Sequence, residues 1–314
     1  MTRPPIPHRT GQRASLGTRA RSAAWRSRLA AALAFVAIPL TDCRPVLDPS
    51  AQVVVTVYPL ELLVRELGGE RVGVATLVPP GASPHAFTPA PTDLASLSRA
   101  ALFVRVGAGF DDWAARLAAV APDSLETLAL LEIRGVEPLA GDDPHVWLDP
   151  ILVRDTIVPE LARRLARMDP AGADAYRQRA RSFSKRLGAL DAEIRLALPG
   201  DGGGYIAYHN AWRHFARRYA LAQVAVVQEF AGEEPTPREL ARLIGAARAG
   251  HVRAILVEPQ LSPRAARVVA AEFGGGTRVV DPLGDPEDRS RSSYEALMRF
   301  NAHAFAEALG GERS

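Results

Sequence analysis

Four side chains of metal-binding type stand at similar points of the sequence, each after an apolar run: His85, His145, His209 and Asp281. The runs are short and rich in β-branched residues, which is typical of strands buried in a parallel sheet. Ligands of open α/β sheets bind beyond the carboxyl ends of the strands, so four such loops can meet at one place. Three imidazoles and one carboxylate form a suitable four-coordinate shell for Zn²⁺. The sequence therefore predicts a zinc site built from four loops.

Two of the histidines directly follow a proline. Pro84 precedes His85 in "PPGASPHAFTPAP", and Pro144 precedes His145 in "GDDPHVWLDP". Proline fixes its own φ angle and so stiffens the loop before any ligand binds. A stiff loop lowers the ordering cost of binding. We therefore expect both loops to hold their imidazoles at set positions.

Other interpretations of these residues stay open from the sequence alone. A single histidine behind a proline is usually an ordinary loop residue, and Asp281 before Pro282 is typical of a turn. Glu258, in "VEPQLSP", also follows an apolar run and is an alternative carboxylate ligand. If Asp281 did not bind, three histidines and a water would resemble the zinc site of a hydrolase. The other histidines lack a strand-end position and are expected on the surface, on helices or in the N-terminal segment: His214, His251, His303 and His8.

Strands and helices alternate in the first half of the chain. Strands are expected at 53–59, 71–79, 101–107 and 125–131. A helix ends at Gly68 and Gly69, and another follows Thr92, which is placed to cap it. This alternation predicts a parallel sheet covered by helices.

A long helix separates this half from a second alternating unit. Residues 169–198 are a nearly continuous helical pattern that Pro199 ends. Strands and helices resume at "YIAYHNA" and close with a helix in "SYEALMRFNAHAFAEAL". The predicted fold class is α/β, with two similar lobes of parallel sheet flanked by helices, one long rigid helix joining them, and the metal site between the lobes. The expected boundaries are 53–165 for the N-terminal lobe, 166–199 for the linker helix and 200–314 for the C-terminal lobe.

Composition excludes several classes of protein. The single cysteine rules out a disulfide framework and a Cys-based zinc site. The formal charge of +3 is dominated by the N-terminus, because residues 1–42 hold seven arginines and one acidic residue. The remainder has three more acidic than basic residues, so no basic surface for nucleic acid is expected.

The N-terminal segment has the features of an export signal. Arginines precede "LAAALAFVAIPL" at 29–40, an apolar run that is short for a bilayer span but suits a signal peptide. Residues 1–42 are expected to be a signal peptide with a long basic region, and 43–52 a tether. Cys43, in "LTDC", resembles the lipidated cysteine of a lipoprotein, although Asp42 replaces the small residue normally found before it. Cys43 is therefore either a lipid anchor or a free thiol, in a periplasmic or cell-surface protein.

From about Val53 to Leu309 the sequence resembles the metal-binding receptors of ABC importers, in the cluster specialised for zinc and manganese. The most specific motif is "DPHVWLDP", which looks like the second ligand loop of that family. "PPGASPHAFTPAPTDLASLSRAALFVRVGAGFDDW" is similar to the first ligand loop and the elements after it, "IAYHNAWRHFARRYAL" to the third, and "VRAILVEPQLSP" and "VVDPLG" to the closing motifs. The resemblance implies a permease partner with its ATPase, no catalytic activity, and four metal ligands: His85, His145, His209 and Asp281.

The third ligand bears on the choice of metal. Manganese-type members of the family tend to have a glutamate where this chain has His209, and imidazole suits zinc whereas carboxylate suits manganese. The expected ligand is therefore Zn²⁺, with Mn²⁺ as the alternative. Many zinc-type members carry a long His- and acid-rich loop before the second ligand, and "LAGDDPH" is short. We expect a monomeric, extracytoplasmic, high-affinity zinc receptor joined to the membrane only by its signal or lipid anchor. The alternatives are a manganese receptor, a metal-dependent adhesin-like lipoprotein and, least favoured, a zinc hydrolase.

Overall fold

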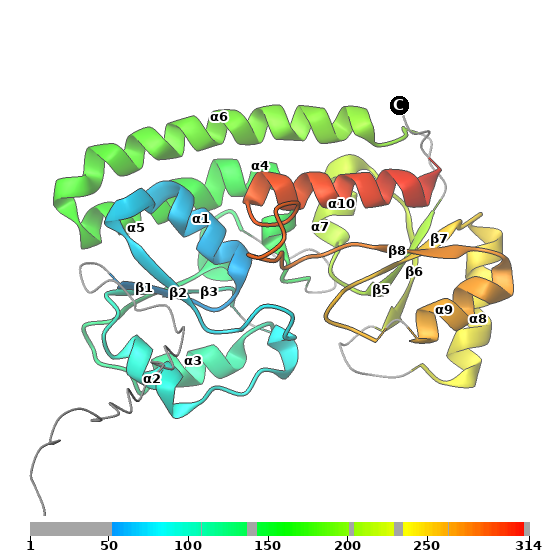
Figure 1. The fold of residues 1–314 in the computed structure, drawn as a ribbon, viewed down its shortest axis with the longest axis horizontal. Helices are drawn as coiled ribbons and strands as arrows, with labels where there is room; N and C mark the ends of the chain where they lie inside the picture. The colour runs from blue at the N-terminus through cyan, green and yellow to red at the C-terminus, as the bar shows by residue number, and fades with distance from the viewer. Residues whose placement is uncertain are drawn as a thin grey trace, which may run out of the picture. The chain divides into compact units, whose positions relative to one another are not determined.

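The computed structural model describes residues 52–107, 109–136, 143–200, 204–228, 235–262 and 264–310, which form two parallel sheets of four strands (Figure 1). The first sheet has the order β2-β1-β3-β4, from β1 (Gln52–Val55), β2 (Gly73–Thr76), β3 (Leu102–Arg105) and β4 (Glu126–Ala129). The second has the order β6-β5-β7-β8, from β5 (Tyr205–His209), β6 (Gln223–Gln228), β7 (Ala254–Val257) and β8 (Gly276–Val279). The shared order confirms the predicted pair of similar α/β lobes. The expected signal peptide and Cys43 lie outside the described residues.

Helices cover both faces of the first sheet. They are α1 (Tyr58–Gly68), α2 (Pro91–Leu97), α3 (Asp112–Ala118) and α5 (Val158–Met168), with α1 and α5 on one face and α2 and α3 on the other (Figure 1). The expected cap at Thr92 is wrong, because α2 begins at Pro91 and Ala90 is the N-cap. Proline suits the first helical position, where its missing N–H would have had no partner. The Asp93 carboxylate accepts the Ala90 amide instead, at 2.7 Å.

The predicted long helix is α6 (Ala173–Ala197), whose 25 residues extend about 37 Å. It follows α4 (Pro150–Leu152), a π-helical stretch (Val153–Ile157) and α5. It packs on α1 and α5 of the first lobe and on α10 (Tyr294–Leu309) of the second (Figure 1). Asp191 on α6 also forms an ion pair of 2.5 Å with Arg218 of the second lobe. The α6 helix therefore joins the two lobes. No helix in the described part of the chain is long and apolar enough to cross a membrane.

The second sheet is flanked by α7 (Arg213–Tyr219), α8 (Pro237–Ala249), α9 (Arg264–Phe273) and α10. Polar caps fix where two of them begin. The Thr236 hydroxyl accepts the Glu239 amide at α8, and the Ser293 hydroxyl accepts the Ala296 amide at α10. Such caps satisfy amides that have no partner within the helix.

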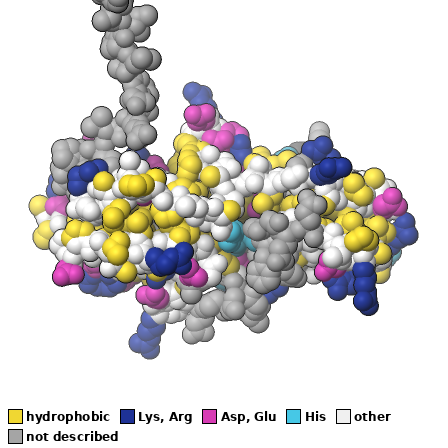
Figure 2. All heavy atoms as spheres, turned by 90° about the horizontal axis from the view of Figure 1, so that it is seen from below, with side chains coloured by type: hydrophobic (Ala, Val, Ile, Leu, Met, Phe, Trp, Pro, Cys, Tyr) yellow, Lys and Arg dark blue, Asp and Glu magenta, His cyan; other side chains and the backbone are white. Residues whose placement is uncertain are grey.

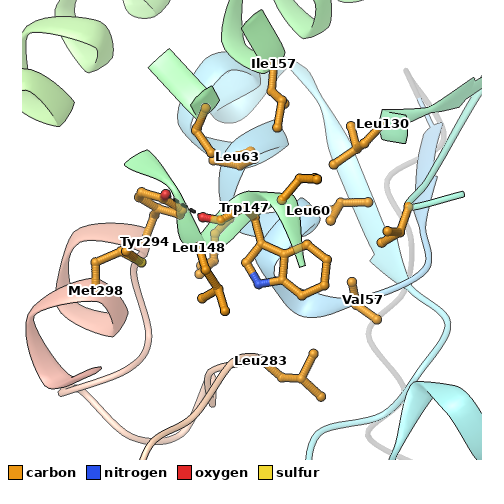
Figure 3. Packing of buried hydrophobic residues seen from close by; sticks show 14 of the residues in the cluster. Val57, Leu60, Leu63, Leu130, Trp147, Leu148, Ile157, Leu283, Tyr294 and Met298 are labelled. Atoms are coloured by element: carbon orange, nitrogen blue, oxygen red, sulfur yellow. Dashed lines mark hydrogen bonds between the residues drawn. The ribbon is translucent and has the colours of Figure 1, made fainter. Parts of the chain in front are cut away.

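Trp147 packs where the two lobes meet. Figure 3 shows its indole among Val57 and Leu60 of the first lobe, with Leu283 of the second lobe nearby. The indole Nε1 donates a 2.7 Å hydrogen bond to the carbonyl of Pro282, and the Tyr294 hydroxyl donates to the Trp147 carbonyl at 2.6 Å. These contacts hold the segment after His145 against the second lobe.

Candidate metal centre

The three histidines predicted from the sequence come together between the lobes. Each offers a ring nitrogen within 4.8 Å of those offered by the other two. They line a cavity of about 20 Å³ with Glu258, Gln260 and several apolar residues. Figure 2, which views the molecule from below, shows histidine (cyan) near the middle of the face drawn. A cavity of this volume accommodates one small ion or one water molecule.

His85 is held by the loop between β2 and α2. It lies in a short 3₁₀ helix (Pro84–Ala86), and the Trp113 indole donates to the Pro84 carbonyl at 3.1 Å. The Phe110 ring packs edge-on against the imidazole, with centroids 4.9 Å apart. Burial, reinforced by the nearby His145, lowers the pKa of His85 to about 4. The ring is therefore neutral at physiological pH, which is the state that binds metal.

His145 is oriented by Asp143, a residue that the sequence reasoning missed. One carboxylate oxygen of Asp143 accepts the His145 amide at 2.9 Å and its ring Nδ1 at 2.7 Å. A carboxylate can only accept, so Nδ1 carries the proton and Nε2 is left to bind a metal. The other carboxylate oxygen of Asp143 accepts the backbone amide of Arg213. The backbone carbonyl of Asp143 pairs with the ring of His214. Burial opposes the charge of Asp143, but His145 outweighs that effect and the pKa of the carboxyl is lowered.

His209 is the last residue of β5 and brings the second lobe into the site. Both of its ring nitrogens are buried and have no hydrogen-bond partner among the described residues. Burial, followed by the two neighbouring imidazoles, lowers the pKa of His209 to about 3. A buried polar group is normally satisfied, and an orphan needs an explanation. A metal ion on one nitrogen would supply it.

The donor set fits zinc. A tetrahedral zinc ion lies about 2.0 Å from each imidazole nitrogen, which places those nitrogens about 3.3 Å apart. The donor atoms of the three histidines lie within 4.8 Å of one another, so they need approach by at most about 1.5 Å to reach that geometry. The Oε1 atom of Gln260, a residue that lines the cavity, is also buried and has no hydrogen-bond partner among the residues that the structure describes.

Asp281 lies beside this group but is not part of it. Its carboxylate accepts Gln260 Nε2 at 3.0 Å and the Leu283 amide at 2.9 Å, and it pairs with Arg291 at 2.7 Å. Pro282 and Leu283 line the cavity, whereas Asp281 does not. The role of Asp281 as fourth ligand therefore stays a prediction.

Glu258 is the carboxyl group that does line the cavity. Burial raises its pKa to about 8, and Trp212 donates a hydrogen bond to it at 3.2 Å. Glu258 is therefore protonated at neutral pH unless a cation comes near it. In the sequence, Glu258 was indicated by its position at the end of a strand. In the structure it lines the cavity, where a metal ligand or an acceptor for a metal-bound water would lie.

The remaining histidines described lie elsewhere. His303 is exposed on α10, and His251 is exposed in the turn after α8. His214 was expected on the surface or on a helix, and it lies on α7. It is fully buried, however, and its ring nitrogen pairs with the Asp143 carbonyl. It supports the residue that orients His145.

Two α/β lobes that enclose ligand-type side chains between them define the class of solute-binding proteins that hold their ligand in the space between two domains. The three imidazoles gathered at one place point to a metal ion as the ligand.

Comparison with known proteins agrees with this class. The family model described as ZnuA, zinc-uptake complex component A, periplasmic, matches residues 53–308. The zinc uptake protein ZnuA of Bacillus subtilis is 26% identical over 82% of this chain and 87% of that protein. The manganese-binding lipoprotein MntA of Halalkalibacterium halodurans is 26% identical over 79% of this chain and 84% of that protein. A crystal structure of ZnuA has a TM-score of 0.75 and 30% identity, and covers 83% of this chain and 100% of that one.

The chain therefore belongs to the ZnuA family of metal receptors of ABC importers. The family consists of substrate-binding receptors rather than enzymes, and its members work with an ABC import system. The resemblance seen in the sequence is confirmed.

Proposed function

We propose that this protein is an extracytoplasmic receptor that binds one zinc ion between its lobes and delivers it to the permease of an ABC importer. The ligands in this proposal are His85, His145 and His209, with Asp281 as the fourth when it leaves Arg291. The observation that supports it most is the group of three imidazoles within 4.8 Å at their donor atoms. In one of them, His209, both nitrogens lack a partner within the described chain.

The preference for zinc over manganese is argued from the ligand types. Manganese is the weakest binder of the first-row divalent metals at nitrogen sites and favours oxygen ligands, whereas imidazole suits zinc. Here the three ligands that lie together are all imidazoles, and the Asp281 carboxylate is bound by a guanidinium. The relatives include both a zinc uptake protein and a manganese-binding lipoprotein, so the metal rests on this argument.

We also propose that the protein is exported and acts as a monomer. The relatives include a lipoprotein, and the matching family is described as periplasmic, which supports export followed either by release after signal cleavage or by anchoring through a lipid on Cys43. Mass spectrometry of the mature N-terminus distinguishes these two forms, since a lipidated chain would begin at Cys43 and carry the mass of its acyl groups.

The test of the function is complementation. A strain lacking this gene receives wild type, His145→Ala or the control His303→Ala, and growth is followed under zinc limitation. His303 is 71% exposed in its side chain and makes no contact with the site, so its variant should rescue growth as wild type does. His145→Ala should fail. Rescue by His145→Ala, or zinc-dependent turnover of an ester or phosphate substrate by the wild type, would overturn the proposal.

A further inference from the structure

The Asp281 carboxylate is bound by a cation of the protein's own. Arg291 Nη1 lies 2.7 Å from Asp281 Oδ2, and the side chain of Asp281 is only 1% exposed. Arg291 is fixed in turn by Asp288 at 2.8 Å and by the face of the Phe300 ring at 5.3 Å. The guanidinium of Arg291 is therefore held beside Asp281 by several contacts, and only 16% of its side chain is exposed.

The loop from Asp281 to Arg291 is built to bring these two residues together. Gly284 has a φ of 81°, and a Cβ there would lie 2.9 Å from the Arg291 carbonyl, so only glycine lets the loop fold back this closely. The Asp285 amide donates to the same carbonyl at 3.3 Å. The Tyr58 hydroxyl of the first lobe donates to the carbonyl of Ser292 at 3.1 Å.

The backbone of Asp281 is clamped, so only its side chain can change partners. Asn301 on α10 accepts the Asp281 amide and donates to the Asp281 carbonyl, both at 2.7 Å. The residues next to Asp281 in the chain, Pro282 and Leu283, line the metal cavity. The Oδ1 atom of Asp281 already accepts from Gln260 and Leu283, so a metal that takes Oδ2 must displace Arg291.

We propose that Arg291 is a specificity-determining residue that competes with the metal for the Asp281 carboxylate, and that this competition disfavours manganese more than zinc. Zinc is satisfied by three imidazoles and one further group, which can be water. Manganese gains little from imidazole and depends on oxygen ligands, so withholding the carboxylate weakens it more. This inference rests on the proposed function and assigns a role to a residue outside the ligand set.

The test measures zinc and manganese dissociation constants by competition with a chelator for wild type, Arg291→Leu, Arg291→Lys and Arg291→Leu/Asp281→Asn. Arg291→Leu should tighten manganese relative to zinc by at least about tenfold, equivalent to ~1.4 kcal/mol. Arg291→Lys keeps the cation beside Asp281 and should keep nearly the wild-type ratio. The double variant should return to that ratio, because the freed carboxylate is gone.

Three outcomes would overturn the inference. An unchanged ratio in Arg291→Leu would mean that Arg291 does not control Asp281. If Arg291→Leu bound both metals equally more weakly and unfolded at a lower temperature, Arg291 would be a structural residue of the loop. A gain in manganese affinity that persists in the double variant would assign it to the general loss of positive charge. Failure of the proposed function is distinct, because wild type and His145→Ala would then bind zinc equally.

Discussion

Asp143 and His145 stand two positions apart, and one carboxylate oxygen of Asp143 accepts both the backbone amide and the ring Nδ1 of His145. The same carboxylate reaches across to the Arg213 amide at the start of α7 in the second lobe. The orientation of a first-lobe ligand therefore depends on a contact with the second lobe, which links the geometry of the site to the way the lobes meet.

Replacing Asp143 by asparagine should weaken zinc binding by roughly 10–100-fold, the usual effect of losing an outer partner of a metal-bound histidine. The amide can donate as well as accept, so it no longer fixes which nitrogen of His145 carries the proton. Titration calorimetry measures the change. Asp155→Asn, at an exposed carboxylate that forms an ion pair with Arg154, is the matched control and should bind as wild type does. Wild-type affinity in Asp143→Asn would show that the tautomer is set in another way.

His209→Ala should weaken zinc binding by more than the ~10–100-fold expected for an outer partner, because it removes a ligand itself. The metal-free protein should lose little stability, because the void beside the cavity is offset by removal of two buried ring nitrogens that have no partner within the described chain. Competition titration and urea unfolding measure the two effects. A large loss of metal-free stability with unchanged affinity would make His209 a core residue and not a ligand.

The metal-free protein should lose stability as the pH falls below about 6.5. Unfolded histidine has a pKa of about 6.5, whereas burial lowers the pKa of folded His85 to about 4 and of His209 to about 3. Between these values the unfolded chain binds more protons than the folded chain, so stability is full above pH 6.5 and declines toward pH 3. Urea midpoints at pH 7.5, 6 and 5 measure this. The double variant His85→Ala/His209→Ala should show a shallower decline, and an equal slope would refute the assignment.

Trp147→Phe should lower the free energy of unfolding by about 1–3 kcal/mol. The change removes a donor to the Pro282 carbonyl and leaves a void in a fully buried position. Tyr294→Phe removes only the hydroxyl that donates to the Trp147 carbonyl and should have a smaller effect. Chemical unfolding gives both values, and the slope with denaturant should not change. If wild type and Trp147→Phe had the same free energy of unfolding, the contact between the lobes at Trp147 would contribute nothing to stability.

The grouping of the three histidines could be predicted because each stands at or after the end of a strand, and parallel strands bring their carboxyl ends to one edge of their sheet. The pairing of Asp281 with Arg291 could not, because it depends on how the loop turns at Gly284. The role of Asp143 had a faint signal in the spacing of "DPH". The burial of His214 had no signal in the sequence, since its ring pairs with the carbonyl of Asp143, a residue far away in the chain. Local pattern fixes which elements form, whereas side-chain partners across loops follow from packing.

Direct competition between zinc and manganese tests the central claim most directly. Protein purified without added metal is analysed for its metal content and then offered both ions at equal concentration. Three imidazoles at one site predict one zinc ion per chain, which manganese does not displace. Displacement of zinc by manganese, or two tightly held ions per chain, would contradict a three-histidine zinc receptor.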